Sequence, residues 1–261
     1  DALVWYRMLI ASVFLVFFIL HKKKSFVVPP KEFVKLIFVG FLIAIHWIFF
    51  FKVIHISNVS ITLAVFFFFS FFASLLEPLF YGRKVLWYEV FFGLVIIAGL
   101  GIILQVEMNY FAGMMYALVS VIVGVLFTLI NGKLTEKHDS SVITFYEFLA
   151  GVVFISIYFL FENKFDANFF ILTANDWILL LILSSVCTAY AFTASVKVMR
   201  KLSPYTIMLT TSLEPVYGII LAYFILGDKE KMSFEFYVGA LLIVLTVILN
   251  GVVKHYLEDK E

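Results

Sequence analysis

Apolar residues occur along the chain in long unbroken runs, separated by short segments that hold most of the Lys and Arg residues. A helix needs about 20 mostly apolar residues to cross a bilayer. Nine runs are predicted to be spans of this kind: Leu3–Leu20, Phe33–Ile54, Val59–Tyr81, Leu86–Val106, Ala112–Gly132, Val142–Phe161, Trp177–Val196, Pro204–Leu226 and Phe236–Val253. Some stretches are apolar at every position, which argues against the alternating strands of a membrane β-barrel. The pattern therefore predicts an all-α polytopic membrane protein.

The composition of the 261 residues narrows the function classes. Hydrophobic residues make up 64% of the chain and charged residues only 14%, against roughly 25% charged in soluble domains. So few charges exclude an ordinary soluble enzyme, a nucleic-acid binder and a disordered chain. A single cysteine, Cys187, excludes a disulfide-stapled secreted domain.

The basic residues of the connecting segments predict an orientation. Segments 21–32, 82–85, 133–141, 197–203 and the tail after Val253 carry 13 Lys and Arg residues, whereas the alternate segments carry Lys52, Lys164, Lys229 and Lys231. Positive charge stays on the cytoplasmic side, so the C-terminus is expected there. Nine spans then place Asp1 outside, and we expect one further helix upstream.

The chain matches itself at an offset of 145. Four positions carry the match: Lys52-Val53 aligns with Lys197-Val198, Asn58 with Ser203, and Gly82 with Gly227. At an offset greater by one residue, segment 87–93 aligns with segment 233–239. The match predicts two repeats, residues 1–106 and 112–253, with four and five helices present. Because five is odd, two complete repeats have opposite orientations, which is a signature of secondary transporters.

The motifs of segment 202–228 resemble those of the EamA-like family of the drug/metabolite transporter superfamily. They are Leu202-Ser203-Pro204, Leu213-Glu214-Pro215 and Leu226-Gly227-Asp228, where Asp228 replaces the family's usual Glu. The resemblance implies a fold of ten helices in two inverted five-helix repeats, of which the first helix is missing here. It also implies movement of small metabolites, often outward, with amino acids among them.

We therefore expect a secondary transporter that exports small metabolites by alternating access, in a bacterial inner membrane. The expected partners are a small-molecule substrate and membrane lipids, with no nucleic acid, catalytic residue, metal or cofactor, and coupling to a proton gradient is an open alternative. The competing hypotheses are a polytopic scaffold or receptor and an intramembrane enzyme. Against the enzyme, the sequence has no His-Glu-x-x-His and no Gly-x-Ser-x-Gly motif.

Ionisable residues in the apolar core of a span are costly and usually face a cavity or a partner. Glu214 lies near the middle of its span, on one helical face with Thr210 and Thr211. Pro215 has no N–H for the carbonyl of Thr211, so this turn is expected to be loosened. Glu214 is either a cation- or proton-binding carboxyl beside that carbonyl, or a residue that fixes a helix break.

His46 is the second ionisable residue near the middle of a span. It titrates near neutral pH when unperturbed, and Trp47 and Phe50 follow it within one turn. These three residues are candidates for lining a substrate cavity. The alternative is a histidine that is hydrogen-bonded between helices, with aromatic residues as filler.

Two further spans carry stripes of small and polar residues at helical spacing. The stripes are Gly113, Tyr116, Ser120, Gly124, Thr128 and Asn131, and Ser184, Thr188, Ala191 and Ser195. Small residues allow close helix packing, and this is the interpretation we favour for both stripes. Tyr116, Ser120 and the neighbouring Tyr190 remain candidates for lining the cavity.

Arg7 and Glu147 occupy equivalent positions at an offset of 140. They are candidate gate residues, and the competing interpretation is that their side chains reach out to the membrane edge. Glu77 and Glu89 flank a basic segment and are predicted to anchor the cytoplasmic edge.

Overall fold

The computed structural model describes residues 2–82, 84–106, 108–165, 167–211, 213–227 and 232–258, and every regular element in this part of the chain is helical. The elements are α1 (Ala2–His21), α2 (Pro30–Ile56), α3 (Val59–Phe66), α4 (Phe68–Tyr81), α5 (Trp87–Val106), α6 (Phe111–Thr135), α7 (Ser140–Phe161), α8 (Ala174–Ser184), α9 (Ala191–Val198), α10 (Pro204–Thr211), α11 (Glu214–Leu226) and α12 (Phe234–Glu258), with the short 3₁₀ helices η1 (Met108–Tyr110) and η2 (Ala167–Phe170) and the π-helix η3 (Ser185–Tyr190). Several residues used in the charge and motif arguments lie outside the described residues: Asp1, Arg83, Asp228, Lys229, Lys231 and Lys260.

The predicted spans are confirmed as helices. Within the described residues, eight helical stretches are long and apolar enough to cross a membrane, counting α3–α4, α8–α9 and α10–α11 as one stretch each. The ninth predicted span corresponds to α5, which holds a shorter apolar stretch at Trp87–Ile103. The predicted architecture of an all-helical membrane protein is therefore correct.

Local sequence signals explain where several helices begin and end. The side chains of Asn58 and Asp139 accept hydrogen bonds from backbone N–H groups at the starts of α3 and α7, which are donors that a helix leaves unpaired. Thr173 and Asp176 form a reciprocal capping box at the start of α8. Gly82 ends α4 with a positive φ of 69°, a conformation that glycine adopts without steric penalty.

The chain folds into two compact units, and each unit draws on both sequence repeats. The α1–α7 unit consists of Asp1–Ile48 and Phe127–Ser203. The α5–α12 unit consists of Phe49–Leu126 and Pro204–Glu261. The long helices α2 and α6 contribute one part to each unit, so the units cut across the repeats at residues 1–106 and 112–253.

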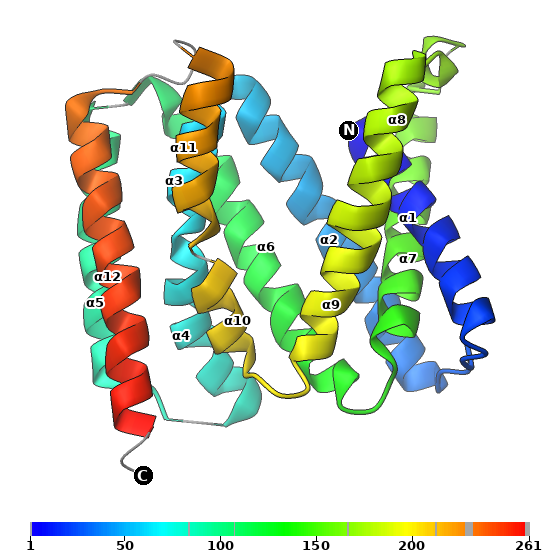
Figure 1. The fold of residues 1–261 in the computed structure, drawn as a ribbon, viewed down its shortest axis with the longest axis horizontal. Helices are drawn as coiled ribbons and strands as arrows, with labels where there is room; N and C mark the ends of the chain where they lie inside the picture. Colours follow the sequence, from blue (N-terminus) through cyan, green and yellow to red (C-terminus); the bar gives the residue numbers. More distant parts are fainter. Residues whose placement is uncertain are drawn as a thin grey trace. The chain divides into compact units, whose positions relative to one another are not determined.

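Equivalent helices of the two repeats pack side by side and antiparallel in the α1–α7 unit (Figure 1). Trp5 near the start of α1 donates to Ser156 near the end of α7, at 2.8 Å. Lys24, just after α1, forms an ion pair with Asp139 just before α7, also at 2.8 Å. The start of α1 thus lies beside the end of α7, and the end of α1 lies beside the start of α7. These equivalent helices therefore run in opposite directions, as inverted repeats require.

The α5–α12 unit has the same antiparallel arrangement. Gly99 of α5 lies against Ile243 of α12, and Ile103 lies against Gly239. A side chain at Gly99 or Gly239 would collide with the facing helix, so these two glycines allow the close approach of α5 and α12.

Two spans of the α5–α12 unit are broken near their middles. α3 ends at Phe66 and α4 begins at Phe68, while α10 ends at Thr211 and α11 begins at Glu214. The two breaks lie one repeat offset apart. α3 packs against α11 and α4 against α10, so the broken helices also pair in antiparallel fashion. The loosened turn predicted at Pro215 is confirmed, whereas the break at Phe67 was not predicted.

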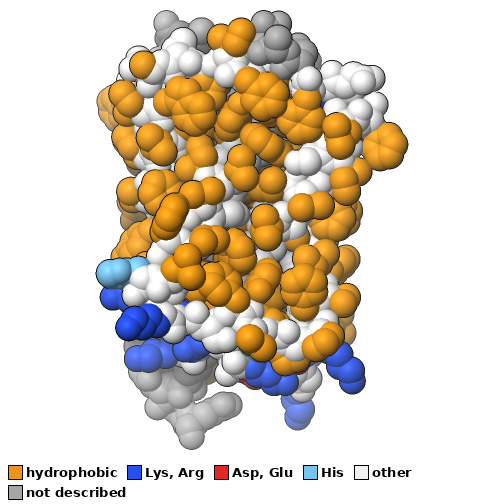
Figure 2. Space-filling model, turned by 90° about the vertical axis from the view of Figure 1, so that its right-hand side faces the viewer, with side chains coloured by type: hydrophobic (Ala, Val, Ile, Leu, Met, Phe, Trp, Pro, Cys, Tyr) orange, Lys and Arg blue, Asp and Glu red, His pale blue; other side chains and the backbone are white. Residues whose placement is uncertain are grey.

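Figure 2 shows apolar and charged side chains on one face of the molecule. Hydrophobic side chains cover most of this face, and Lys and Arg side chains gather at one end. In the α1–α7 unit the exposed large apolar side chains include Phe17, Leu20, Leu160 and Phe161. Large apolar side chains open to solvent on this scale are typical of a surface that faces lipid.

Candidate functional site

The α1–α7 unit holds a half-buried cation, Arg7, that contacts two other helices. Arg7 of α1 donates from Nε to Oγ1 of Thr188, at 2.5 Å, and its guanidinium lies 4.1 Å from the ring centroid of Trp47. Thr188 is fully buried in the π-helix η3, and Trp47 lies in α2 and is 7% exposed. Three helices therefore meet around one permanent positive charge, and π-helical turns of this kind are common at functional sites.

The Trp47 ring that contacts this cation belongs to a group of aromatic side chains. The indole of Trp47 lies 5.5 Å from Phe148 and 6.3 Å from Phe192. The ring of His46 lies 5.4 Å from Phe127, which in turn lies 6.0 Å from Phe192. The two predicted residues His46 and Trp47 are thus in one buried cluster, together with three phenylalanines that the sequence did not distinguish from the other Phe residues.

The second ionisable group inside the α1–α7 unit is Glu147 of α7. Its side chain has no solvent exposure, and its Oε2 accepts a hydrogen bond from Nδ2 of Asn131 in α6 at 3.2 Å. Its Oε1 is buried without a hydrogen-bond partner, and among the described residues no basic side chain forms an ion pair with it. An isolated carboxylate in such surroundings is costly, so this group needs a proton or a ligand.

Other buried polar atoms lie at the level of Glu147. Thr144 precedes Glu147 by one turn, and Thr135 follows Asn131 by one turn. The hydroxyls of both threonines and Oδ1 of Asn131 are also buried without hydrogen-bond partners. The Asn131–Glu147 hydrogen bond joins α6 to α7, and each helix carries a further buried threonine hydroxyl one turn from it.

These positions change the interpretation of Arg7 and Glu147. We predicted either a gate role or side chains that reach the membrane edge. The second alternative is wrong, because Arg7 bonds a buried threonine and Glu147 is completely enclosed. Glu77 and Glu89, which are predicted to anchor the cytoplasmic edge, are only 4% and 1% exposed.

The remaining predicted residues fall into the α5–α12 unit, with the exception of Tyr190. Phe50 packs against Phe66, and Tyr116 lies beside Phe49 with Lys52 over its ring at 4.3 Å. Ser120 is fully buried in α6. These contacts therefore lie within the α5–α12 unit.

Thr210, Thr211 and Glu214 lie at the break between α10 and α11, and all three side chains are exposed. Glu214 is the first residue of α11, where a carboxylate is stabilised by the helix dipole. Thr210 donates its hydroxyl to the carbonyl of Thr206. The break thus combines a carboxylate with a carbonyl of Thr211 that has no helical partner, because Pro215 lacks an N–H.

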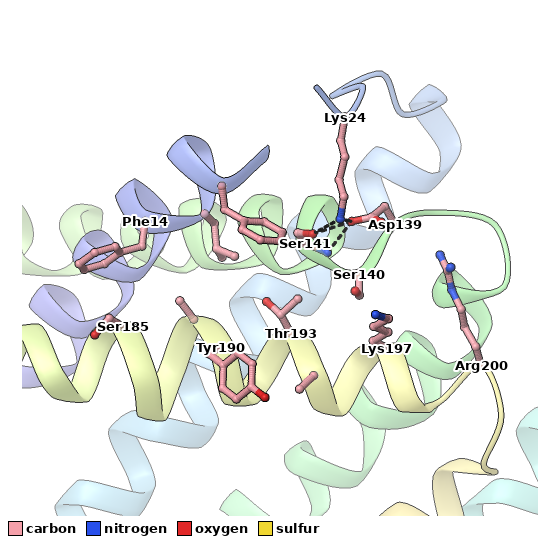
Figure 3. A pocket seen from close by; sticks show the side chains of 14 residues that line it. Phe14, Lys24, Asp139, Ser140, Ser141, Ser185, Tyr190, Thr193, Lys197 and Arg200 are labelled. Atoms are coloured by element: carbon pink, nitrogen blue, oxygen red, sulfur yellow. Dashed lines mark hydrogen bonds and ion pairs between the residues drawn. The ribbon is translucent and has the colours of Figure 1, made fainter. Parts of the chain in front are cut away.

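Tyr190 lines a cavity of about 470 Å³ inside the α1–α7 unit (Figure 3). The cavity lies between α1, the start of α7 and the stretch from η3 to α9. At one end Lys24 binds both Oδ1 of Asp139 and the hydroxyl of Ser141. Burial by itself raises the pKa of Asp139, but hydrogen bonds from Lys24 and Ser141 and the charge of Lys24 outweigh it and hold that pKa below its ordinary value.

Sequence reasoning missed Thr188 and Asn131 as partners of the charged residues. Both belong to the polar stripes that we interpreted as packing surfaces. The sequence contained a signal, because Thr188 and Asn131 are larger than close helix packing requires. Their partners could not be identified from the sequence: Thr188 bonds Arg7, 181 residues away, and Asn131 bonds Glu147 on the next helix.

Comparisons with known proteins agree with this architecture. The model of the EamA-like transporter family matches residues 2–105 and 111–252. Among 27 matching chains of solved structures, one titled only "Crystal structure of protein" has a TM-score of 0.71 and 14% sequence identity, covering 98% of this chain and 88% of its own. No protein with a curated description matches. Because the family model covers nearly the whole chain in two copies, the chain belongs to the EamA-like transporter family.

Proposed function

We propose that the protein is a secondary transporter that exports small metabolites carrying a carboxylate, amino acids among them, by alternating access. It works in a bacterial inner membrane with its C-terminus in the cytoplasm. The observation that carries the proposal is the pair of broken helices, α3–α4 and α10–α11. They are broken at equivalent positions of the two repeats and pack against each other in antiparallel fashion.

Breaks of this kind favour transport over a scaffold function. A broken helix leaves backbone donors and acceptors unpaired at membrane depth, and such a defect is tolerated where it faces protein or a polar cavity. Transporters built from inverted repeats use discontinuous helices to form their substrate and ion sites. A scaffold or receptor has no need for two equivalent breaks.

Arg7 supports a substrate with a carboxylate. Its guanidinium is always charged and offers donors in a planar fork that suits a carboxylate. Trp47 holds the guanidinium plane from one side and Thr188 holds Nε. These two contacts hold the guanidinium in one orientation inside the α1–α7 unit.

Glu147 supports coupling to protons. An enclosed carboxyl with one bonded and one unbonded oxygen exists in the membrane at lower free energy when protonated. Proton uptake from one side and release to the other would link its charge to the alternating conformations. Among the described ionisable residues, Glu147 is the best placed for this step because it is fully buried in its span.

Flux into proteoliposomes tests the function directly. The purified protein is reconstituted, and radiolabelled amino acids and other carboxylate metabolites are screened with and without an imposed pH gradient. We expect saturable flux of at least one carboxylate metabolite, stimulated by the gradient. Absence of flux for every carboxylate substrate, with neutral metabolites transported instead, would overturn the proposed substrate class.

The broken helix is tested by a matched pair of variants. Glu214→Gln removes the exposed carboxylate at the start of α11, and Glu235→Gln removes an exposed carboxylate in the first turn of α12. We expect Glu214→Gln to impair flux and Glu235→Gln to leave it unchanged. Equal flux in both variants would show that the carboxylate at the break has no part in transport.

A further inference from the structure

The cavity that Tyr190 lines has two chemically different ends (Figure 3). Lys24, Lys197 and Arg200 lie at one end, close to Asp139 and Ser141, whereas Phe14 and Ser185 lie at the other. Leu15, Phe18 and Ala189 complete the apolar wall. A volume of about 470 Å³ is within the range of pockets that bind small ligands, about 300–1,000 Å³.

The charges at the polar end do not cancel. Lys24 and Asp139 form an ion pair at 2.8 Å, so their two charges balance. Arg200 donates to the backbone carbonyls of Thr135 and His138, which are neutral. Among the described residues, no acceptor or acid bonds the ammonium of Lys197, which is exposed. The polar end therefore keeps two positive charges without an acidic partner.

We propose that this cavity binds one anionic phospholipid from the membrane leaflet at its lysine-rich end. The phosphate lies against Lys197 and Arg200, and an acyl chain lies along Phe14, Phe18 and Ala189. The site is distinct from the Arg7 and Glu147 clusters and does not depend on the proposed transport activity.

The chemistry of the walls favours this occupant over other ligands. A free anion would leave the apolar wall without a contact, and an uncharged lipid would leave the two cations without a counter-charge. Basic pockets between membrane helices at the cytoplasmic side are recognised as sites for anionic headgroups. The charge distribution of the cavity follows the same order as an anionic lipid in a leaflet, with charge at the edge and hydrocarbon towards the interior.

The test measures lipid retention by native mass spectrometry of the detergent-solubilised protein. Phosphatidylglycerol is the anionic probe, and phosphatidylcholine with the same acyl chains is the zwitterionic comparison. We expect one phosphatidylglycerol to be retained in preference to phosphatidylcholine. Equal retention of the two lipids would overturn the proposal, as would competition by millimolar inorganic phosphate, which would indicate a site for free anions.

Variants locate the site. Lys197→Gln removes one cation and is expected to weaken phosphatidylglycerol binding roughly fivefold, since a Lys near an anionic headgroup contributes about 1 kcal/mol. Ala194→Trp fills the cavity and is expected to abolish retention of the lipid. Lys31→Gln removes an exposed lysine that does not line the cavity and is the control. Equal effects of Lys197→Gln and Lys31→Gln, or full retention in Ala194→Trp, would place any bound lipid elsewhere.

Discussion

The two compact units use their buried polar side chains in different ways. In the α5–α12 unit, Asn58 accepts from a backbone N–H of α3, and Glu77 accepts from the N–H of Tyr205 at the start of α10, at 3.2 Å. Asn250 donates to the hydroxyl of the same tyrosine at 2.7 Å. These contacts close helix ends or fix them in place, so the architecture of the unit accounts for them.

In the α1–α7 unit two charged side chains lie inside the spans. Arg7 meets a side chain of η3, and Glu147 meets a side chain of α6, and neither contact closes a helix end. A charged group within a span is costly unless it serves a ligand, an ion or a partner. Glu77 and Glu147 are both buried, but Glu77 bonds a backbone N–H at a helix start and Glu147 bonds a side chain within a span. Burial alone therefore does not identify a functional carboxylate; the group that it bonds must also be known.

The strongest test of this difference removes the charge of Glu147. We expect Glu147→Gln to reduce gradient-driven flux at least tenfold, because a glutamine amide takes up no proton at that position. Glu162→Gln is the control, since Glu162 lies exposed at the end of the same helix. Flux and its pH dependence are measured in proteoliposomes, and wild-type behaviour of Glu147→Gln would remove Glu147 from the coupling mechanism.

Glu77 is expected to show the opposite behaviour. Glu77→Leu leaves the N–H of Tyr205 without its buried acceptor, which destabilises the fold by about 1–3 kcal/mol. The unfolding midpoint in detergent should fall, while flux per folded molecule stays close to that of the wild type. Glu235→Leu, at an exposed site of the same unit, should leave both quantities unchanged. A stable Glu77→Leu variant without flux would assign Glu77 to transport.

Arg7 gives a smaller effect that concerns substrate affinity. Arg7→Lys keeps the positive charge but loses the planar contact with Trp47 and the bond from Nε to Thr188. A cation–π contact contributes about 0.5–2 kcal/mol. We therefore expect the KM for a carboxylate substrate to rise by roughly 2- to 30-fold, with little change for a neutral substrate. An unchanged KM would show that Arg7 is structural.

The smallest expected effect concerns the ion pair of Lys24 and Asp139. The pKa of Asp139 is lowered in the folded protein, so the pair stabilises the fold above the ordinary pKa of Asp139 and loses this contribution as the pH falls through the lowered value. The ordinary value is 3.8, so the loss occurs below about pH 4. A partly exposed pair is worth about 0.2–1 kcal/mol.

Asp139→Asn tests this ion pair. The unfolding midpoint of the wild type should fall more steeply than that of Asp139→Asn as the pH is lowered below 4. At neutral pH the variant should be slightly less stable than the wild type. Identical pH dependence of the two proteins would show that the ion pair does not contribute to stability.

Some features of the fold could be predicted because their causes are local. The spans follow from the length of each apolar run, and the broken turn follows from the missing N–H of Pro215. Asn58 illustrates the same point, since a residue with an acceptor side chain precedes the apolar run of α3 and caps it. The break at Phe67 has no such signal, because neither proline nor glycine lies beside it.

The sequence by itself determined where the apolar helices lie along the chain, the repeat and membership of a transporter family. Each of these depends on residue types and their order along the chain. Only the tertiary structure decided that Arg7 meets Thr188 and Trp47, that Glu147 meets Asn131, and that Lys24 meets Asp139. Such contacts depend on the rotation and depth of each helix against its neighbours, and packing of the whole unit sets both quantities.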